Sequence, residues 1–214
     1  MQDINYFSTR FGPNQTRTKL WPVLVKYLQR RFIPEDAVVL DIGAGYCDFI
    51  NNVRAKEKHA VDVSTIPAEY ASSDSILHVC PCSDLRDLGD GYFDIVFASN
   101  LFEHLEREEF LKTLGEVKRV LKTGGKLIVL QPNYRLCYKS YFDDYTHLQI
   151  FTDRSLTDIL KVYRLNPIVV IPRFLPFSVQ SSVLPYPWLL WIYLHLPLRP
   201  FAGQMLLVAE NPGA

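Results

Sequence analysis

Hydrophobic residues recur along this chain with two different periods. From Gln15 to Phe32 apolar side chains follow the spacing of one helix face, and Pro34 ends the pattern. Short runs that are apolar on both faces come next, as the strands of a parallel sheet covered on both sides require. These runs lie at 37–42, 58–63, 76–80, 93–99 and 125–131.

Further helices are expected between and after these strands. One apolar stripe covers 106–122, and Thr123-Gly124-Gly125 is expected to stop that helix and form a turn. A second helix is expected at 153–163, opening with Thr152 or Asp153 as its cap, and two more strands at 166–171 and 204–209. The alternation predicts an α/β fold with right-handed crossovers, whose ligand site lies at the carboxyl ends of the strands.

One segment, 172–201, departs from this alternation. It is rich in proline, and its middle is apolar nearly all round. Pro187 suits a helix start and Pro197 a helix stop, which gives a helix too short to span a bilayer. The segment is either a lid that buries itself on the core or on a dimer partner, or a substrate channel or membrane-surface contact. We expect one domain over 1–214, with 172–201 as an apolar insertion before the last strand.

Composition narrows the class of partner and the compartment. Basic and acidic residues balance at 23 each, so no global field favours nucleic acid as a partner. The first residues do not resemble a signal peptide, and no uninterrupted run of about 18 apolar residues occurs. Four cysteines without a C-x-x-C pair are typical of reduced thiols. These features predict a cytoplasmic protein, with peripheral membrane association left open.

The ends of the first two strands carry the most specific pattern. The first apolar run ends in Asp41-Ile42-Gly43-Ala44-Gly45, and the second ends at Asp62. A Gly-x-Gly turn lets a ligand lie against backbone amides, and an acid at the second strand tip accepts hydrogen bonds from a ribose. The pattern predicts a nucleoside-containing cofactor. A nicotinamide dinucleotide would favour a third glycine where Asp48 stands.

Two later blocks decide between cofactors. Residues 93–105 and 120–129 resemble the fourth-strand and fifth-strand segments of class I S-adenosylmethionine-dependent methyltransferases, and the resemblance covers about 36–165. It implies a Rossmann-like, doubly wound sheet of seven strands in the order 3-2-1-4-5-7-6, with strand 7 antiparallel. It also implies S-adenosylmethionine as the cofactor.

The resemblance assigns the cofactor contacts residue by residue. Asp41, Gly43 and Gly45 would form the turn under the methionine and ribose, and Asp62 would bind the ribose hydroxyls. Asp84 and Leu85 match an acid-apolar pair that contacts the adenine, and Asn100 would lie near the methyl group. Cys47 stands where the family often has a small residue; it either simply fits there or is a reactive thiol at a helix N-terminus.

Methyl transfer to a hydroxyl needs a base, and two polar segments supply candidates. Glu103-His104 follows the fourth strand, and Asp144 and His147 lie in the polar stretch after the fifth. The catalytic candidates are His147 as the base, His104 and Asp144; the alternative is that they only brace the loop. The combination is similar to quinone-biosynthesis O-methyltransferases and small-RNA 2′-O-methyltransferases, in which such residues hold a divalent metal. Because Asn100 replaces a further glutamate of that pattern, we expect no metal, with a site of Glu103, His104 and His147 left open.

The acceptor is predicted only by class. The polar 141–149 loop favours hydroxyl groups and the 175–201 segment favours an apolar tail, so we expect O-methylation of a small or lipid-linked acceptor of the sugar or quinol type. The C-terminal pattern also loosely resembles methyltransferases of surface-polysaccharide assembly. The alternative is a non-catalytic module that docks a partner through 183–201. A homodimer is left open.

Overall fold

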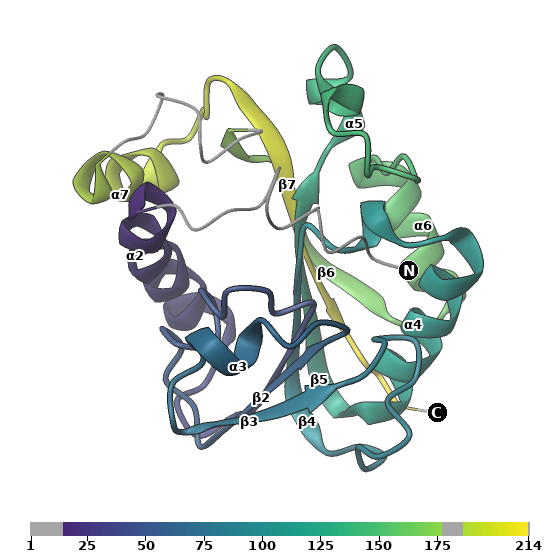
Figure 1. Ribbon diagram of the computed structural model, residues 1–214. Coiled ribbons are helices and arrows are strands. Elements are labelled where there is room, and N and C mark those ends of the chain that lie inside the picture. The colour runs from purple at the N-terminus through teal and green to yellow at the C-terminus, as the bar shows by residue number, and fades with distance from the viewer. Residues whose placement is uncertain (1–14, 177–185, 214) are drawn as a thin grey trace.

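One mixed sheet of seven strands organises the chain, in the order β3-β2-β1-β4-β5-β7-β6 (Figure 1). The computed structural model describes residues 15–176 and 186–213, so part of the predicted 172–201 insertion lies outside them. The strands are β1 Val38–Ile42, β2 Glu57–Asp62, β3 Ser75–Val79, β4 Phe93–Ser99, β5 Leu121–Pro132, β6 Asn166–Pro176 and β7 Ala202–Glu210.

The pairing of these strands confirms the predicted fold class. Strands β3, β2, β1, β4 and β5 run parallel, and β7 lies antiparallel between β5 and β6. The order and the reversed seventh strand are those implied by the methyltransferase resemblance. Parallel pairing brings the carboxyl ends of β1, β2 and β4 to one edge, where the predicted cofactor residues lie.

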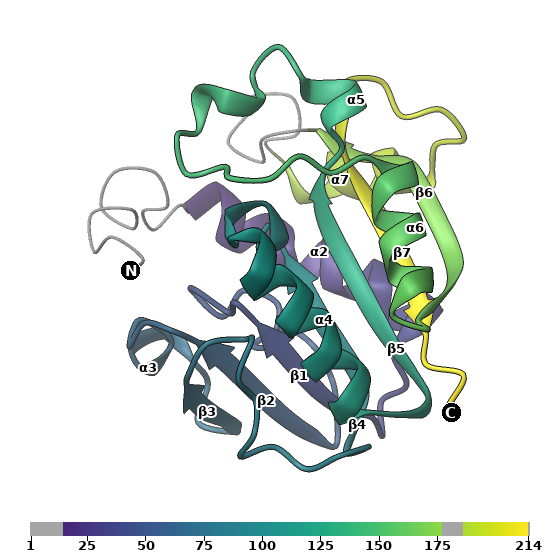
Figure 2. The same cartoon turned by 90° about the vertical axis from the view of Figure 1, so that its right-hand side faces the viewer.

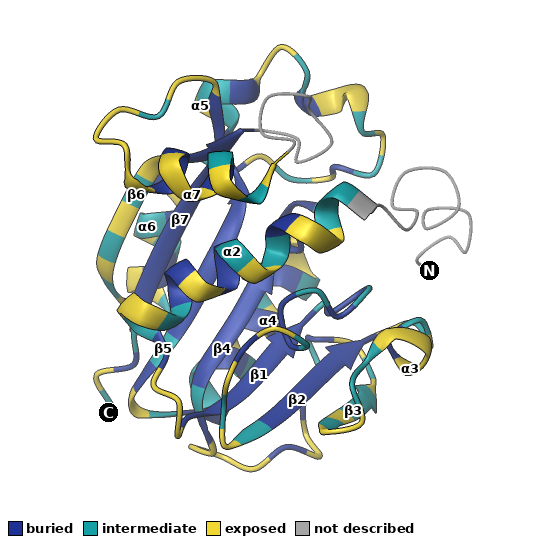
Figure 3. Cartoon of the chain, turned by 90° about the vertical axis from the view of Figure 1, so that its left-hand side faces the viewer, coloured by how far each residue is buried: buried dark blue, intermediate teal, exposed yellow. Residues whose placement is uncertain are grey.

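Helices cover both faces of the sheet (Figures 2 and 3). The longer ones are α2 Gln15–Phe32, α4 Arg107–Val120, α6 Asp153–Val162 and α7 Pro187–His195. The short ones are α3 Pro67–Tyr70, η1 Phe102–His104, α5 Tyr134–Cys137 and η2 Tyr141–Asp143. Thr152 caps α6 through a reciprocal pair of hydrogen bonds with Ser155, which fixes where the chain leaves the site loop.

The period-2 alternation of the strands divides the core into two layers. On β1, Leu40 packs with the apolar stripes of α4 and α6, whereas Val39 packs with those of α2 and α7. Both residues are completely buried. Burial of each such aliphatic side chain contributes roughly 1.5–3 kcal/mol to the free energy of folding. The two apolar layers therefore stabilise the position of the sheet and of its strand ends.

The largest differences from the boundaries expected from the sequence lie between α4 and β5 and at the end of β6. The helix predicted at 106–122 ends at Val120, and β5 begins at the next residue instead of after the Thr123-Gly124-Gly125 turn. Leu121 pairs with Phe93, and the register then shifts so that Lys126 pairs with Ile95. The glycines therefore form an irregularity inside the strand, with Gly124 at φ +79°. Strand β6 also extends beyond 171, to Pro176.

The helix expected between Pro187 and Pro197 is present as α7. Its buried residues Leu190, Tyr193 and Leu194 pack into the α2 layer of the core. Among the residues described, no helix combines the length and apolar character that crossing a bilayer would require.

Candidate cofactor and catalytic site

The turn after β1 is shaped by its two glycines. Gly43 and Gly45 have φ values of +69° and +49°, and a Cβ on Gly43 would lie 2.8 Å from a methyl carbon of Leu101. The backbone N–H groups of Gly43 and Ala44 both donate to the carbonyl of Val61, at 2.8 and 3.1 Å. The turn is thereby held against the end of β2 with little side-chain bulk over it.

Asp62 joins the turn to the tip of β2. Its Oδ2 accepts the backbone N–H of Gly45 at 2.9 Å, and its Oδ1 accepts the N–H and the hydroxyl of Ser64. A carboxylate offers about four lone-pair positions, so three donors leave capacity for a hydroxyl of a ligand. The arrangement therefore fits a ribose at this position.

Asp41, at the centre of this site, is buried under the same turn. Burial raises the pKa of its carboxyl well above the usual range, and the nearby charges of Asp62 and Asp48 raise it further. A positively charged group of a ligand would relieve this repulsion. The sulfonium and amino groups of S-adenosylmethionine are such groups, so the acidic set of the turn suits that cofactor.

Asn100 ends β4 at the same edge of the sheet. It adopts a left-handed conformation with φ +47°, its N–H donates to the carbonyl of Leu130, and its Oδ1 accepts from Gln204 Nε2 at 3.3 Å. Gln131, near the end of β5, is buried, and its amide has no hydrogen-bond partner among the described residues. The sequence gives no role to Gln131 or Gln204, because glutamine at a strand end carries no specific signal.

The two residues predicted to contact the adenine, Asp84 and Leu85, form their hydrogen bonds outside the glycine turn. Asp84 is partly exposed and pairs with Arg86 at 2.7 Å, and the N–H of Leu85 donates to Glu116 of α4 while its side chain enters the core. One of these hydrogen bonds stays within the 84–86 loop and the other leads to α4, and neither involves Asp62 or the glycine turn. An adenine role for Asp84 and Leu85 stays a prediction.

Cys47 behaves as a buried small residue. The chain from 47 to 53 forms hydrogen-bonded turns and no regular helix, so Cys47 does not lie at a helix N-terminus. Burial, followed by the charges of Asp41 and Asp62, raises the pKa of its thiol to about 12. These observations oppose a reactive thiolate.

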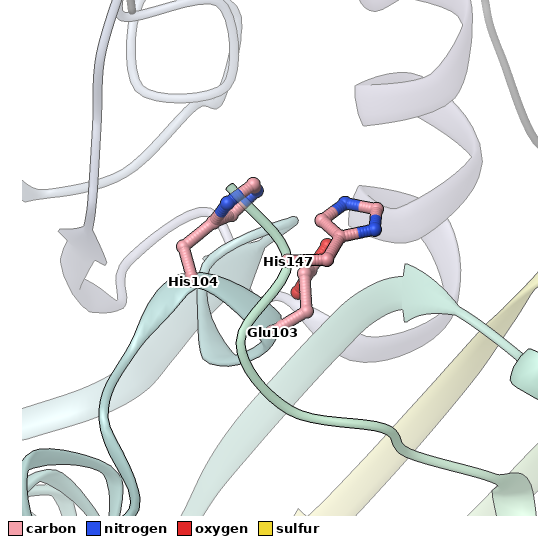
Figure 4. Close-up of side chains that lie close together, drawn as sticks. All are labelled: Glu103, His104 and His147. Carbon is pink, nitrogen blue, oxygen red and sulfur yellow. The ribbon is translucent and has the colours of Figure 1, made fainter. Parts of the chain in front are cut away.

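The loop after β5 is fastened to η1 and the residue after it by hydrogen bonds to their backbone carbonyls. The carbonyl of Glu103 accepts the N–H of Leu148 at 2.8 Å, and Gln149 Nε2 donates to the carbonyl of Leu105 at 2.8 Å. These bonds bring His147 beside His104, with ring centroids 5.0 Å apart. In Figure 4 the side chains of Glu103, His104 and His147 converge, and one ligand atom from each lies within 4.8 Å of the others.

Hydrogen bonds define the tautomers of both histidines. His147 Nδ1 lies 2.6 Å from the carbonyl of Tyr141, which can only accept, so Nδ1 carries a proton, and in the neutral imidazole the lone pair is on Nε2. The hydroxyl of Thr146 donates to Asp144 and therefore accepts from His104 Nδ1 at 3.0 Å. Asp144 is thus linked to His104 through the Thr146 hydroxyl. It also accepts a hydrogen bond from the backbone N–H of Thr146.

Glu103 is the least satisfied group of the cluster. It is buried, and neither carboxylate oxygen has a hydrogen-bond partner in the described part of the chain. Burial raises its pKa to about 8, and burial together with His147 lowers the pKa of His104 to about 4. Two imidazoles and an unsatisfied carboxyl form a donor set suited to a divalent transition metal.

Comparison with known proteins agrees with the fold. Residues 40–129 match the family model described as a methyltransferase domain. An uncharacterised protein of Methanocaldococcus jannaschii is 27% identical over 161 residues, which cover 71% of this chain and 68% of that protein.

Solved structures of methyltransferases superpose on most of the chain. A SAM-dependent methyltransferase from Archaeoglobus fulgidus has a TM-score of 0.64 at 21% identity, covering 88% of this chain and 94% of that one. The 1,6-didemethyltoxoflavin N1-methyltransferase of Burkholderia thailandensis, with S-adenosylhomocysteine bound, has a TM-score of 0.58 at 17% identity, covering 94% and 80%. The geranyl diphosphate C-methyltransferase of Streptomyces coelicolor has a TM-score of 0.63 at 16% identity, covering 88% and 76%. Residues 40–129 therefore match a methyltransferase domain, and the chain has the same fold as these solved SAM-dependent methyltransferases.

Proposed function

We propose that this protein transfers the methyl group of S-adenosylmethionine to a hydroxyl oxygen of a small or lipid-linked acceptor. The observation that carries the proposal is His147: its Nδ1 is anchored to the Tyr141 carbonyl, and the residue lies in the cluster with Glu103 and His104. A hydroxyl acceptor needs a base, whereas acceptors that are already nucleophilic need only positioning.

The chain's own residues divide the chemistry between two places. Bound S-adenosylmethionine supplies a methyl group on a positively charged sulfur, which makes it electrophilic. Asp41, Gly43, Gly45 and Asp62 bind and orient the cofactor. His147 Nε2 takes the proton of the acceptor hydroxyl as the oxygen forms its bond to the methyl carbon and the carbon–sulfur bond breaks. The in-line geometry required depends on the loop bonds to Glu103 and Leu105.

A metal-assisted form of the same reaction is a second candidate. It is favoured by the two buried oxygens of Glu103, which the described residues leave without a hydrogen bond. Glu103, His104 and His147 would hold a divalent ion, which would supply Lewis acidity at the acceptor oxygen. With the ion present, His147 would be a ligand and not the base.

The acceptor class follows from the surroundings of this cluster. The loop around Thr146 and Asp144 is polar, whereas α7 lies at the same end of the molecule and is apolar nearly all round (Figure 1). A sugar or quinol head on an apolar tail would match both. The related solved enzymes named above act at nitrogen and at carbon, so they support the reaction class and not the acceptor atom.

A non-catalytic module that docks a partner through 183–201 is the alternative in a different class. The glycine turn and Asp62 disfavour it, because a scaffold without chemistry has no need of a hydrogen-bonded ribose site.

Transfer of labelled methyl from S-adenosylmethionine to prenylated quinols and lipid-linked sugars tests the proposal. Each acceptor is offered with EDTA and with added Mg²⁺ or Mn²⁺. Transfer to a hydroxyl in EDTA supports His147 as the base, and transfer only with metal supports the Glu103, His104 and His147 site. Cofactor binding with transfer to nitrogen or carbon acceptors alone would overturn O-methylation.

A further inference from the structure

The surface formed by residues 186–201, here the α7 surface, exposes more large apolar side chains than its own packing explains. Leu198 is 82% exposed, Phe201 77%, Trp188 62% and Trp191 50%. Tyr186, Ile192 and Leu196 are exposed beside them. The inward residues Leu190, Tyr193 and Leu194 fasten α7 to the core, whereas the outward ones lie outside the buried cluster. An apolar patch of this kind marks an interaction site.

Charge is distributed unevenly around this patch, although the chain as a whole is neutral. No acidic residue occurs between Asp158 and Glu210, and α2, which packs beside α7, carries basic residues and no acidic ones. Lys26, Arg30 and Arg31 of α2 line a shallow recess together with Trp191 and His195 of α7. Arg31 lies over the ring of Tyr27 at 3.8 Å. Aromatic side chains next to a rim of cations complement a surface that is apolar and negatively charged.

We propose that the α7 surface and the basic face of α2 dock this protein on an anionic membrane. Exposed tryptophans favour the interfacial region of a bilayer, and lysine or arginine near the surface is attracted by anionic lipid. Helix α7 has nine residues, so it lies along the membrane and does not cross it. In Figure 3, α7 and α2 lie side by side on one face of the molecule, so the apolar and basic groups reach the same plane.

The geometry also has a consequence for access to the site. Helix α7 and the loop that carries His147 lie at the same end of the molecule, beyond the carboxyl ends of the parallel strands (Figures 1 and 2). Docking through α7 therefore places the cluster near the membrane surface. The docking proposal itself rests on exposure and charge alone and holds whatever the acceptor is.

Sedimentation of the full chain with vesicles tests the proposal directly. Vesicles of phosphatidylcholine alone are compared with vesicles containing phosphatidylglycerol, at low and high salt. We expect binding to the anionic vesicles, weakened by salt, together with a blue shift of tryptophan emission. Trp188→Ser with Trp191→Ser should weaken binding at least about tenfold, and Lys26→Gln with Arg30→Gln by roughly 30-fold.

Matched variants on the opposite face serve as controls. Val162→Ser with Val170→Ser removes two exposed apolar groups from the α6 side of the sheet, and Lys112→Gln with Lys161→Gln removes two exposed charges on α4 and α6. Both control pairs should bind vesicles like the wild type, and calorimetry with S-adenosylhomocysteine verifies that every variant is folded. The proposal is overturned by absent wild-type binding, by equal losses in the controls, or by dimerisation that the Trp188 and Trp191 changes abolish without any vesicle binding.

Discussion

At the scale of single residues, Asp62 connects the glycine turn after β1 to the second strand. Its carboxylate holds the Gly45 amide at 2.9 Å and faces the edge where the ligand would lie. Asp62→Asn keeps the size of the side chain but removes its charge, and we expect cofactor affinity to fall about 5- to 150-fold, or about 1–3 kcal/mol. Calorimetric titration measures this, with the exposed Asp36→Asn as the control. Equal affinity for the two variants would show that the ribose site is misassigned.

His147 is the residue on which the proposed chemistry depends most. His147→Ala removes the basic Nε2 while the glycine turn is untouched, so turnover should fall on the order of 10²-fold or more with cofactor affinity unchanged. The control is His78→Ala, because His78 lies on β3 in contact with His59, outside this cluster. Full activity of the His147 variant would reduce it to a brace for the loop.

Glu103 separates the two forms of the mechanism. If the cluster binds Mn²⁺, an excess of about 100 times the dissociation constant should stabilise the wild type by about 2.7 kcal/mol and raise its Tm by several degrees. Glu103→Gln should abolish the shift, whereas Glu108→Gln, in the first turn of α4, should retain it. If Mn²⁺ does not change the Tm of the wild type, the metal site is contradicted and His147 remains as a base that acts without metal.

Sequence motifs predicted some of these residues and missed others for physical reasons. Asp62 ends the second apolar run and His147 lies in the polar loop after the fifth strand, so the position of each along the chain indicates that it lies near a strand end. The hydrogen bonds that join Asp144 to His104 through the Thr146 hydroxyl cannot be predicted from the sequence. They depend on the folded positions of the three side chains, in which the hydroxyl donates to Asp144 and accepts from His104. Gln131 was missed because burial without a partner is a property of the folded chain.

At the scale of elements, two glycines near each other in sequence have opposite roles. Gly115 lies inside α4 with open space where a Cβ would point, so Gly115→Ala should raise the free energy of unfolding by about 0.5–1 kcal/mol. A Cβ on Gly125 would lie 2.9 Å from the Lys122 carbonyl oxygen and 3.0 Å from that of Phe93. Gly125→Ala should therefore destabilise by about 1–3 kcal/mol. Urea denaturation of both variants tests the pair, and a stable Gly125→Ala would contradict the close packing.

The same region shows why element boundaries are harder to predict than elements. Every strand and every longer helix was expected near its observed position, because periodicity reports which face is buried. The start of β5 was not, since it is decided by pairing of Leu121 with Phe93, two residues far apart in sequence. The pattern Thr123-Gly124-Gly125 indicates a turn, but the ladder absorbs it as an irregularity.

At the scale of the whole molecule, the two layers of helices cover the faces of the sheet, and the proposed site lies at one end of it. The strand ends bring together an acidic turn, a cluster of Glu103, His104 and His147, and the apolar α7 nearby (Figure 2). The order of the strands was predicted from the methyltransferase resemblance and is confirmed. The acceptor was predicted only by class, because its shape depends on loops whose sequence carries no fixed pattern.

Calorimetric titration of the full chain with S-adenosylmethionine and S-adenosylhomocysteine tests the central claim most directly. The cofactor site predicts one binding site per chain, with dissociation constants for both ligands in the range of about 1–100 μM, which corresponds to roughly 5–8 kcal/mol. Absence of heat with either ligand at millimolar concentration, from protein shown to be folded, would contradict a methyltransferase function.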